Sequence, residues 1–453
     1  MSSSPLIVLM ALTSILVLPG GSFQTARPES VADLLLKDEV QQAEAVLDRQ
    51  PKTAETAAFH GEVEYRKGNF DKADSFYKEA LKMNPNTARA HFGLGKLAMA
   101  KLKGKDAIQA INRAIAIDPK EPLYHLYASE AWAIDKNYAE QRKQLEEYIR
   151  LNPNDPDRLA EAKAGLEMLK TLGTENVAVV TAPENPAPIR FRTSLNLIFT
   201  SVMINGHGPY DFAIDTGATQ IVLSEKLATE IGLKPITSTV MHGVGGGGRI
   251  DTKLYSVNEL SVGDVKIKNI PVGTFNDPLV TQLADGILGT AVLSDFIITV
   301  NYPNNQVELS RKRTAPSAAT EVLPVWYFSN LLLLPLEVNG QYRGNFVVDT
   351  GAVTTVISHS MAAKLGVNEN TPGAKIDLGI AGVGGFEGVV LRIPNVTLKT
   401  AKNTEAFPQL VSIDLKEVSK MLGTEVAGVV GYDFFSEYKV TLDYYAAEVR
   451  LNK

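Results

Sequence analysis

Cysteine is absent from all 453 residues of the chain. Its absence excludes disulfide bonds, cysteine nucleophiles, cysteine-rich zinc sites and cysteine-linked lipid anchors. A large excess of charge of one sign is missing as well, because 45 basic residues stand against 51 acidic ones and the net charge is −6. We therefore expect no nucleic acid among the partners. Otherwise the composition, 45% hydrophobic and 21% charged, is that of an ordinary globular protein.

Long hydrophobic runs are also missing, except for one near the N-terminus. Residues 6–18, LIVLMALTSILVL, form thirteen residues without a charge. A membrane span needs about 20 apolar residues, whereas a run of this length is typical of a secretory signal peptide. We predict a signal peptide over residues 1–22, a periplasmic or secreted protein, and no membrane span after cleavage. A retained N-terminal anchor is the alternative, because the first five residues, MSSSP, contain no Lys or Arg.

Prolines recur at a constant interval in the first third of the chain. Pro51, Pro85, Pro119 and Pro153 are each 34 residues apart. Before Pro85 and before Pro119, small residues and one larger residue stand at matching offsets, namely Gly61, Ala73, Tyr77 and Ala80, then Gly95, Ala107, Ile111 and Ala114. Small residues let two antiparallel helices approach closely, and a proline ends the second helix. The pattern therefore predicts an array of helix pairs.

This array resembles the tetratricopeptide repeat (TPR). The prolines place three repeats at 54–87, 88–121 and 122–155, with a degenerate helix around 31–50 and a final helix at 157–172. We thus expect an all-α TPR solenoid over residues 30–172. The resemblance implies a binding scaffold without chemistry of its own, which would take a protein partner in its groove. An unrelated helical bundle with coincidental prolines is the alternative.

The helical period stops at residues 173–190, a segment rich in Pro, Ala and polar residues that we interpret as a linker. Beyond it, apolar and polar residues alternate as in strands. Residues 204–217, INGHGPYDFAIDTG, return 134 positions later as residues 338–351, VNGQYRGNFVVDTG. A glycine-rich segment and a short apolar segment ending in Gly follow in each copy. The repetition predicts two related β lobes, at 191–311 and 321–453.

Together these motifs resemble aspartic proteases, most closely bacterial retropepsin-like ones. The resemblance implies an all-β bilobal aspartic-protease domain pair after the TPR solenoid. It makes Asp215 and Asp349 the catalytic dyad, two carboxylates about 3 Å apart that share one proton. The ionised member would activate a water, and the protonated one would donate to the scissile carbonyl. Neither role is assigned to either aspartate, and the chemistry requires no cofactor and no metal.

The residues after each aspartate would support the dyad: Thr216, Gly217 and Ala218 in one lobe, and Thr350, Gly351 and Ala352 in the other. The threonine hydroxyls would cross-link the lobes, and the glycines would allow close backbone approach. Pepsin-like enzymes usually carry Ser or Thr where this chain has alanine. Since alanine cannot stabilise the ionised carboxylate through a hydroxyl, we expect a raised dyad pKa and a working pH nearer neutral than that of pepsin.

The glycine-rich segments are expected to be flaps that close over an extended peptide. The predicted flap and substrate-binding residues are Gly243, Val244, Gly245 and Gly246 in the first copy, and Gly382, Val383, Gly384, Gly385 and Phe386 in the second. Residues 243–248 also satisfy G-x-G-x-x-G, but strand-like alternation follows them where a nucleotide-binding fold needs a helix.

The sequence thus predicts an aspartic endopeptidase, a hydrolase that acts on a peptide or protein, with its two lobes paired within one chain. Pairing of lobes between two chains stays open. Two other functions stay open as well. One is a peptide-binding module that keeps the fold without cleaving, and the other is an adaptor in which the TPR array carries the function.

Overall fold

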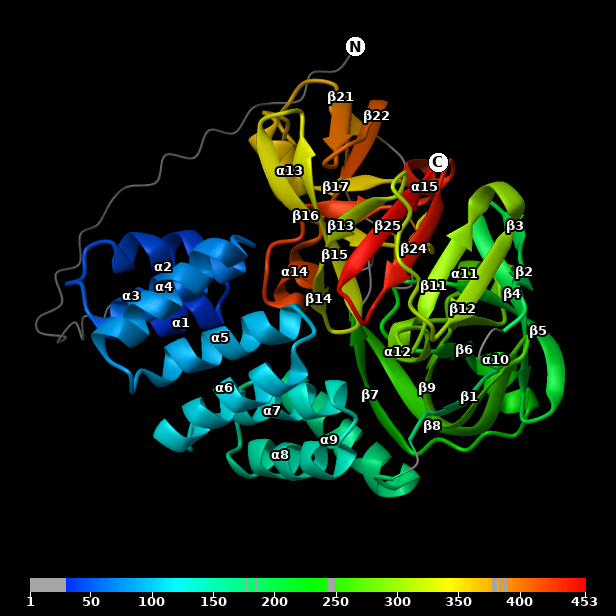
Figure 1. The fold of residues 1–453 in the computed structure, drawn as a ribbon, viewed down its shortest axis with the longest axis horizontal. Coiled ribbons are helices and arrows are strands. Elements are labelled where there is room, and N and C mark those ends of the chain that lie inside the picture. Colours follow the sequence, from blue (N-terminus) through cyan, green and yellow to red (C-terminus); the bar gives the residue numbers. More distant parts are fainter. Residues whose placement is uncertain are drawn as a thin grey trace, which may run out of the picture.

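The computed structural model describes residues 30–175, 177–183, 186–242, 249–376, 381–382, 385–386 and 389–453. A helical array is followed by a β-rich part with two large sheets and a third that joins them (Figure 1), which confirms the predicted fold class. The predicted signal peptide lies outside the described residues. Within those residues, no helix combines the length and apolarity needed to cross a membrane.

The helical array comprises nine helices in the described part of the chain. They are α1 (Val31–Leu36), α2 (Val40–Leu47), α3 (Ala54–Arg66), α4 (Phe70–Met83), α5 (Ala88–Ala100), α6 (Gly104–Ile117), α7 (Pro122–Ile134), α8 (Tyr138–Arg150) and α9 (Pro156–Leu172). The pairs α3–α4, α5–α6 and α7–α8 are the three predicted repeats. The single helix expected around 31–50 is instead two short ones, because the chain turns at Asp38, whose φ is 61°.

Small residues produce the predicted close packing inside the repeats. A Cβ on Gly61 would lie 2.5 Å from the ring of Tyr77, and one on Gly95 would lie 2.5 Å from Cγ1 of Ile111. Contacts between repeats follow the same 34-residue interval, since Lys96 Nζ lies 2.6 Å from Glu62 Oε2. The Lys96 side chain is only 3% exposed, and its burial lowers its pKa to about 8.

Lobe 1 contains the strands β3 (Arg192–Ser194), β4 (Leu197–Ile204), β5 (His207–Ile214), β6 (Val222–Ser224), β7 (Thr237–His242), β8 (Arg249–Val262), β9 (Val265–Phe275), β10 (Gly286–Leu288), β11 (Ile297–Asn301) and β12 (Gln306–Ser310). Its helices are α10 (Glu225–Glu230), α11 (Pro278–Leu283), α12 (Thr290–Leu293) and the 3₁₀ turn η1 (Tyr302–Asn304). The expected linker adds two short strands, β1 (Val179–Thr181) and β2 (Ile189–Arg190), because its backbone pairs with β9 and β12.

Lobe 2 contains the strands β13 (Glu321–Pro324), β14 (Trp326–Phe328), β15 (Leu331–Val338), β16 (Tyr342–Val348), β17 (Val356–Ser358), β18 (Lys375–Ile376), β19 (Ala381–Gly382), β20 (Gly385–Phe386), β21 (Val390–Lys399), β22 (Thr404–Ile413), β23 (Gly428–Val430), β24 (Lys439–Asp443) and β25 (Glu448–Asn452). Its helices are α13 (His359–Lys364), α14 (Lys416–Leu422) and α15 (Tyr432–Phe435).

Three sheets of the described chain organise the β-rich part. Lobe 1 is built on the order β1-β9-β6-β10-β5-β4-β8-β7, with β3 paired to β4, and lobe 2 on β14-β15-β16-β23-β17-β22-β21-β18. The third sheet, β13-β25-β24-β11-β12-β2, takes strands from both lobes and joins them through the antiparallel pair β11–β24. Because β5 and β16 occupy matching places in the first two sheets, the loops that follow them are brought together.

Candidate active site

Each Asp-Thr-Gly loop begins where a buried strand ends. Asp215 follows β5 and Asp349 follows β16, and both strands run parallel to a short apolar strand, β10 in lobe 1 and β23 in lobe 2. The amide of Asp215 donates to the carbonyl of Leu288 at 3.2 Å, and the amide of Asp349 donates to that of Val430 at 3.1 Å. The parallel neighbour therefore fixes the backbone of each aspartate in the same way.

The two threonines cross-link the loops. The Thr216 hydroxyl donates to the carbonyl of Val348 and the Thr350 hydroxyl to that of Ile214, each at 2.8 Å. Each hydroxyl also accepts from the amide of the other threonine, at 3.1 and 3.0 Å. Both side chains are buried, with 1% and 3% exposed. Four hydrogen bonds without access to water thus hold the loops in a nearly two-fold arrangement.

The glycines leave the space that the aspartates occupy. A Cβ on Gly217 would lie 2.4 Å from Cγ of Asp349, and a Cβ on Gly351 would lie 2.4 Å from Cγ of Asp215. Each carboxyl group therefore packs against the glycine of the opposite loop. Any larger residue at either glycine would displace the aspartate of the other lobe.

The two carboxyl groups form a hydrogen bond with each other, and burial raises the pKa of both. The pKa of Asp349 is raised well above its ordinary value, because the charge of Asp215 and the shared proton also oppose its ionisation. Burial raises the pKa of Asp215 as well, while hydrogen bonds from Asp349, Gly217 and Ala218 favour its charged form. The pair therefore holds one proton above the pH at which an ordinary aspartate loses it.

The backbone donors around the dyad are unequal. Asp215 Oδ1 accepts from the amides of Gly217 at 2.8 Å and Ala218 at 3.0 Å. Asp349 Oδ1 accepts from the amide of Gly351 at 2.7 Å, while the amide of Ala352 donates to the main-chain carbonyl of Asp349 at 3.4 Å. Since amide donors stabilise a carboxylate, this arrangement favours the negative charge on Asp215.

All the predicted dyad-support residues lie at this centre, but the flap residues are only partly described. Gly243, Val244, Gly245, Gly246, Val383 and Gly384 lie outside the described residues. The strands that lead to the first tip are described, and β7 pairs with β8 as far as His242 and Arg249. In lobe 2, Gly382 and Gly385 pair in the two-residue strands β19 and β20, and Phe386 pairs with Ala381. Both segments are therefore hairpin arms.

The structure adds two residues that no motif predicted. In lobe 1, the Thr290 amide and hydroxyl both donate to the carbonyl of Ala218 at 2.8 Å. In lobe 2, the Asp433 carboxylate accepts from the Thr355 amide at 2.7 Å and the Thr354 hydroxyl at 2.8 Å. Thr290 offered no sequence signal. Asp433 did, because the corresponding position of the first copy is Ala291 and an acidic residue there is particular to lobe 2.

The chemistry open to this centre is proton transfer. It offers two carboxyl groups that share one proton and backbone amides that fix them. Both aspartates are half-buried, so the carboxyl groups stay accessible. The described residues contain no group of three or more acidic or histidine side chains that could hold a metal ion.

Comparisons with known proteins agree with this geometry. The family model "Aspartyl protease" matches residues 200–292 and 334–434, one match in each lobe. The model "Tetratricopeptide repeat" matches residues 60–122 and 105–156. Each β lobe thus matches the aspartyl protease family, and the helical array matches the tetratricopeptide repeat.

A weaker similarity links the chain to DNA damage-inducible protein 1 of Yarrowia lipolytica. The two are 26% identical over 167 residues, which cover 35% of this chain and 38% of that protein. The similarity thus spans well under half of either chain.

Proposed function

We propose that the protein is an aspartic endopeptidase in which Asp215 and Asp349 act as one dyad on a water molecule. The observation that carries the proposal is the mutual arrangement of the two loops, in which the carboxyl groups meet and each packs against the glycine of the other lobe. Membership of both lobes in the aspartyl protease family supports the same reaction class.

In the proposed mechanism the two aspartates have different roles in the resting state. Asp215, with two amide donors, is the ionised member and takes a proton from the attacking water. Asp349, whose Oδ1 accepts from the single amide of Gly351, carries the shared proton and donates it to the scissile carbonyl oxygen. The threonine cross-links hold the carboxyl groups in place, so little reorganisation is needed during the reaction.

The substrate would be an extended peptide between the lobes. The β7–β8 arms and the β19–β20 arms would close over it, which excludes water and offers main-chain hydrogen bonds. The protein would act after export, and the repeat array would bind a protein partner in its groove. Cell fractionation tests whether the protein is exported, and mass spectrometry of the mature N-terminus tests whether residues 1–22 are removed.

The direct test is cleavage of a peptide library by the wild-type protein at pH values from about 3 to 8. We expect cleavage with an optimum above about pH 3, because the pKa of the dyad is raised. Asp215→Asn and Asp349→Asn should each abolish it, while Asp211→Asn, an exposed position on the outer face of lobe 1, serves as the control. If the folded wild type cleaves nothing over this range but binds peptides, the chain is a peptide-binding module instead.

A further inference from the structure

The outer faces of the two lobes differ at positions that the duplication makes equivalent. In lobe 1, Arg192 Nη2 lies 3.0 Å from Asp211 Oδ2, and both side chains are about half exposed. The residues 134 positions later are Trp326 and Asn345. A solvated ion pair in one copy is thus replaced by an aromatic and an uncharged amide in the other. Such an exchange is expected where a surface is covered.

The repeat array covers this face of lobe 2. The ring of Phe70, at the start of α4, lies 4.5 Å from that of Trp326 and 5.4 Å from that of Phe328. The ring of Tyr65, at the end of α3, lies 6.0 Å from that of Phe328. The apolar residues of α3, α4 and α5 form one continuous core with those of lobe 2. In lobe 1, the strand equivalent to β14 is the polar β3. The apolar residues behind it form a small cluster that contains no residue of the helical array.

Hydrogen bonds complete the contact at the turn between α3 and α4. The last carbonyls of a helix have no partner within it. Lobe 2 supplies donors here. The Glu425 amide donates to the Arg66 carbonyl at 2.7 Å, and the Thr424 hydroxyl donates at 2.9 Å to the Tyr65 carbonyl, which also accepts from the Gly68 amide at 3.0 Å. The Asn345 side chain donates from Nδ2 to the Gly68 carbonyl at 3.2 Å.

These bonds reach the strands that carry Asp349. Asn345 lies in β16, four residues before Asp349, at a distance of roughly 13 Å along an extended strand. Its own carbonyl accepts from the Ala427 amide at 2.8 Å, just before β23, the strand that fixes the Asp349 amide. The turn therefore contacts the middle of β16 and the segment just before β23, the two strands whose far ends hold the aspartate.

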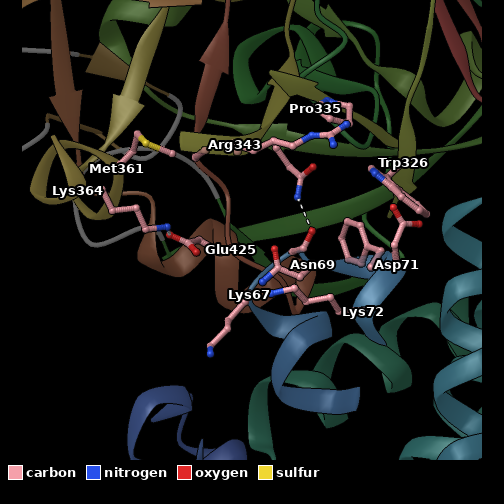
Figure 2. Close-up of a pocket in the computed structure, with 15 residues that line it drawn as sticks. Lys67, Asn69, Asp71, Lys72, Trp326, Pro335, Arg343, Met361, Lys364 and Glu425 are labelled. Atoms are coloured by element: carbon pink, nitrogen blue, oxygen red, sulfur yellow. Dashed lines mark hydrogen bonds and ion pairs between the residues drawn. The ribbon is translucent and has the colours of Figure 1, made fainter. Parts of the chain in front are cut away.

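A cavity of about 230 Å³ lies beside this contact. Figure 2 shows Asn69 and Asp71 of the repeat array on one side, and Trp326 and Arg343 of lobe 2 on the other. Beside the apolar core that α3 to α5 share with lobe 2, the Asn345 side chain adds a direct hydrogen bond from β16 to the turn.

We propose that the α3–α4 turn is a positioning element for Asp349, which makes the repeat array an internal partner of lobe 2. The turn acts through Asn345 and through the paired strands β16 and β23. Lobe 1 holds the strand before Asp215 with bonds of its own, since the Asp285 amide donates to the Asp211 main-chain carbonyl at 2.8 Å and the Asp211 amide donates to Asp285 Oδ2 at 2.9 Å. The Asp211 side chain takes no part in these bonds and pairs with Arg192 instead. The catalytic consequence rests on the proposed function, whereas the positioning of the strand does not.

Gly68→Ala tests the inference sterically. A Cβ at this position would lie 2.5 Å from Asn345 Nδ2, and the backbone has a φ of +76°. Gly366→Ala is the matched control, because Gly366 has a φ of +83° and nothing within 4 Å of its added Cβ. Gly68→Ala should lower kcat roughly 10- to 100-fold with KM little changed, and should shift the pH–rate profile. Gly366→Ala should carry the same backbone strain without either effect.

Asn345→Asp tests the inference through chemistry, with Asp211→Asn as its reciprocal control in lobe 1. The new carboxylate cannot donate to the Gly68 carbonyl. We expect faster amide hydrogen exchange over residues 346–350 in Asn345→Asp and Gly68→Ala, and unchanged exchange in both controls.

Exchange is measured without any substrate. If wild-type protein cleaves no peptide, the proposed function fails while the exchange data still decide the positioning. If both test variants are folded and match the wild type in exchange, the inference is overturned; where the protein cleaves, a wild-type kcat and pH profile would also overturn it.

Discussion

Lobe 1 and lobe 2 are alike where they face each other and unlike where they face away. The Asp-Thr-Gly loops share their cross-links, their glycine contacts and their parallel neighbour strands. The faces at β3 and β14 have diverged, since β3 in lobe 1 is polar and carries an ion pair, whereas β14 in lobe 2 packs on α3 to α5. The array touches lobe 1 elsewhere, through α9. A duplicated fold thus keeps the positions fixed by the shared centre and changes those that acquire a different neighbour.

The largest expected effect should be equal in the two lobes. Asp215→Asn and Asp349→Asn each remove one half of the dyad, and each should lower kcat/KM by roughly 10²–10⁴-fold or more. Initial rates on a cleaved peptide measure this. Substantial activity in one variant alone would show that only one lobe supplies the chemistry, and would break the equivalence of the inner faces.

The next largest effect is a loss of stability that should differ between the two lobes. Phe328→Ala removes a ring from the core that joins lobe 2 to the repeat array, where it is 7% exposed. Loss of a buried aromatic ring costs roughly 3–5 kcal/mol of unfolding free energy. Ser194→Ala, at the equivalent position of β3, should cost less than about 0.5 kcal/mol. Denaturant titration measures both, and similar losses would contradict the divergence of the outer faces.

The threonine cross-links should again be equivalent. Thr216→Val and Thr350→Val each leave a buried carbonyl and a buried amide without their hydroxyl partner. An unsatisfied buried group costs roughly 1–3 kcal/mol, and the two variants should lose similar amounts. Serine at the same positions keeps the hydroxyl and should restore most of the stability. A loss in one lobe only would show that the cross-link is one-sided.

The smallest effect should appear in how the stability of the folded protein depends on pH. Folding raises the pKa of Asp349 well above its ordinary value of 3.8, so the unfolded chain releases this proton at lower pH than the native state. The contribution to stability is therefore fully present below pH 3.8 and is lost as the pH rises towards the folded pKa. Asparagine cannot ionise and loses nothing. The gain in Tm from Asp349→Asn should therefore grow with pH, and thermal unfolding at several pH values measures it.

Much of the fold could be predicted because its signals are local and repeated. The prolines at one interval give the helix pairs, and the second copy of INGHGPYDFAIDTG identifies two related lobes and both aspartates. The break at Asp38 left no periodic signal, because one positive φ is enough to end a short helix. The contact between Gly68 and Asn345 joins residues 277 positions apart, and no local pattern encodes such a pair. A position-by-position comparison of the copies could have indicated it, through Arg192 against Trp326.

The sheet that joins the lobes also determines when, during synthesis, the two lobes can pair. The lobes join through β24, which pairs with β11 and begins 90 residues after Asp349. A ribosome adds residues one by one at roughly 5–20 per second, so both aspartates exist for several seconds before the lobes can be fastened together. During that interval the half-made chain holds both aspartates without the sheet that joins their lobes. Under the proposed function, this order of synthesis would keep the dyad unaligned until most of the chain is made.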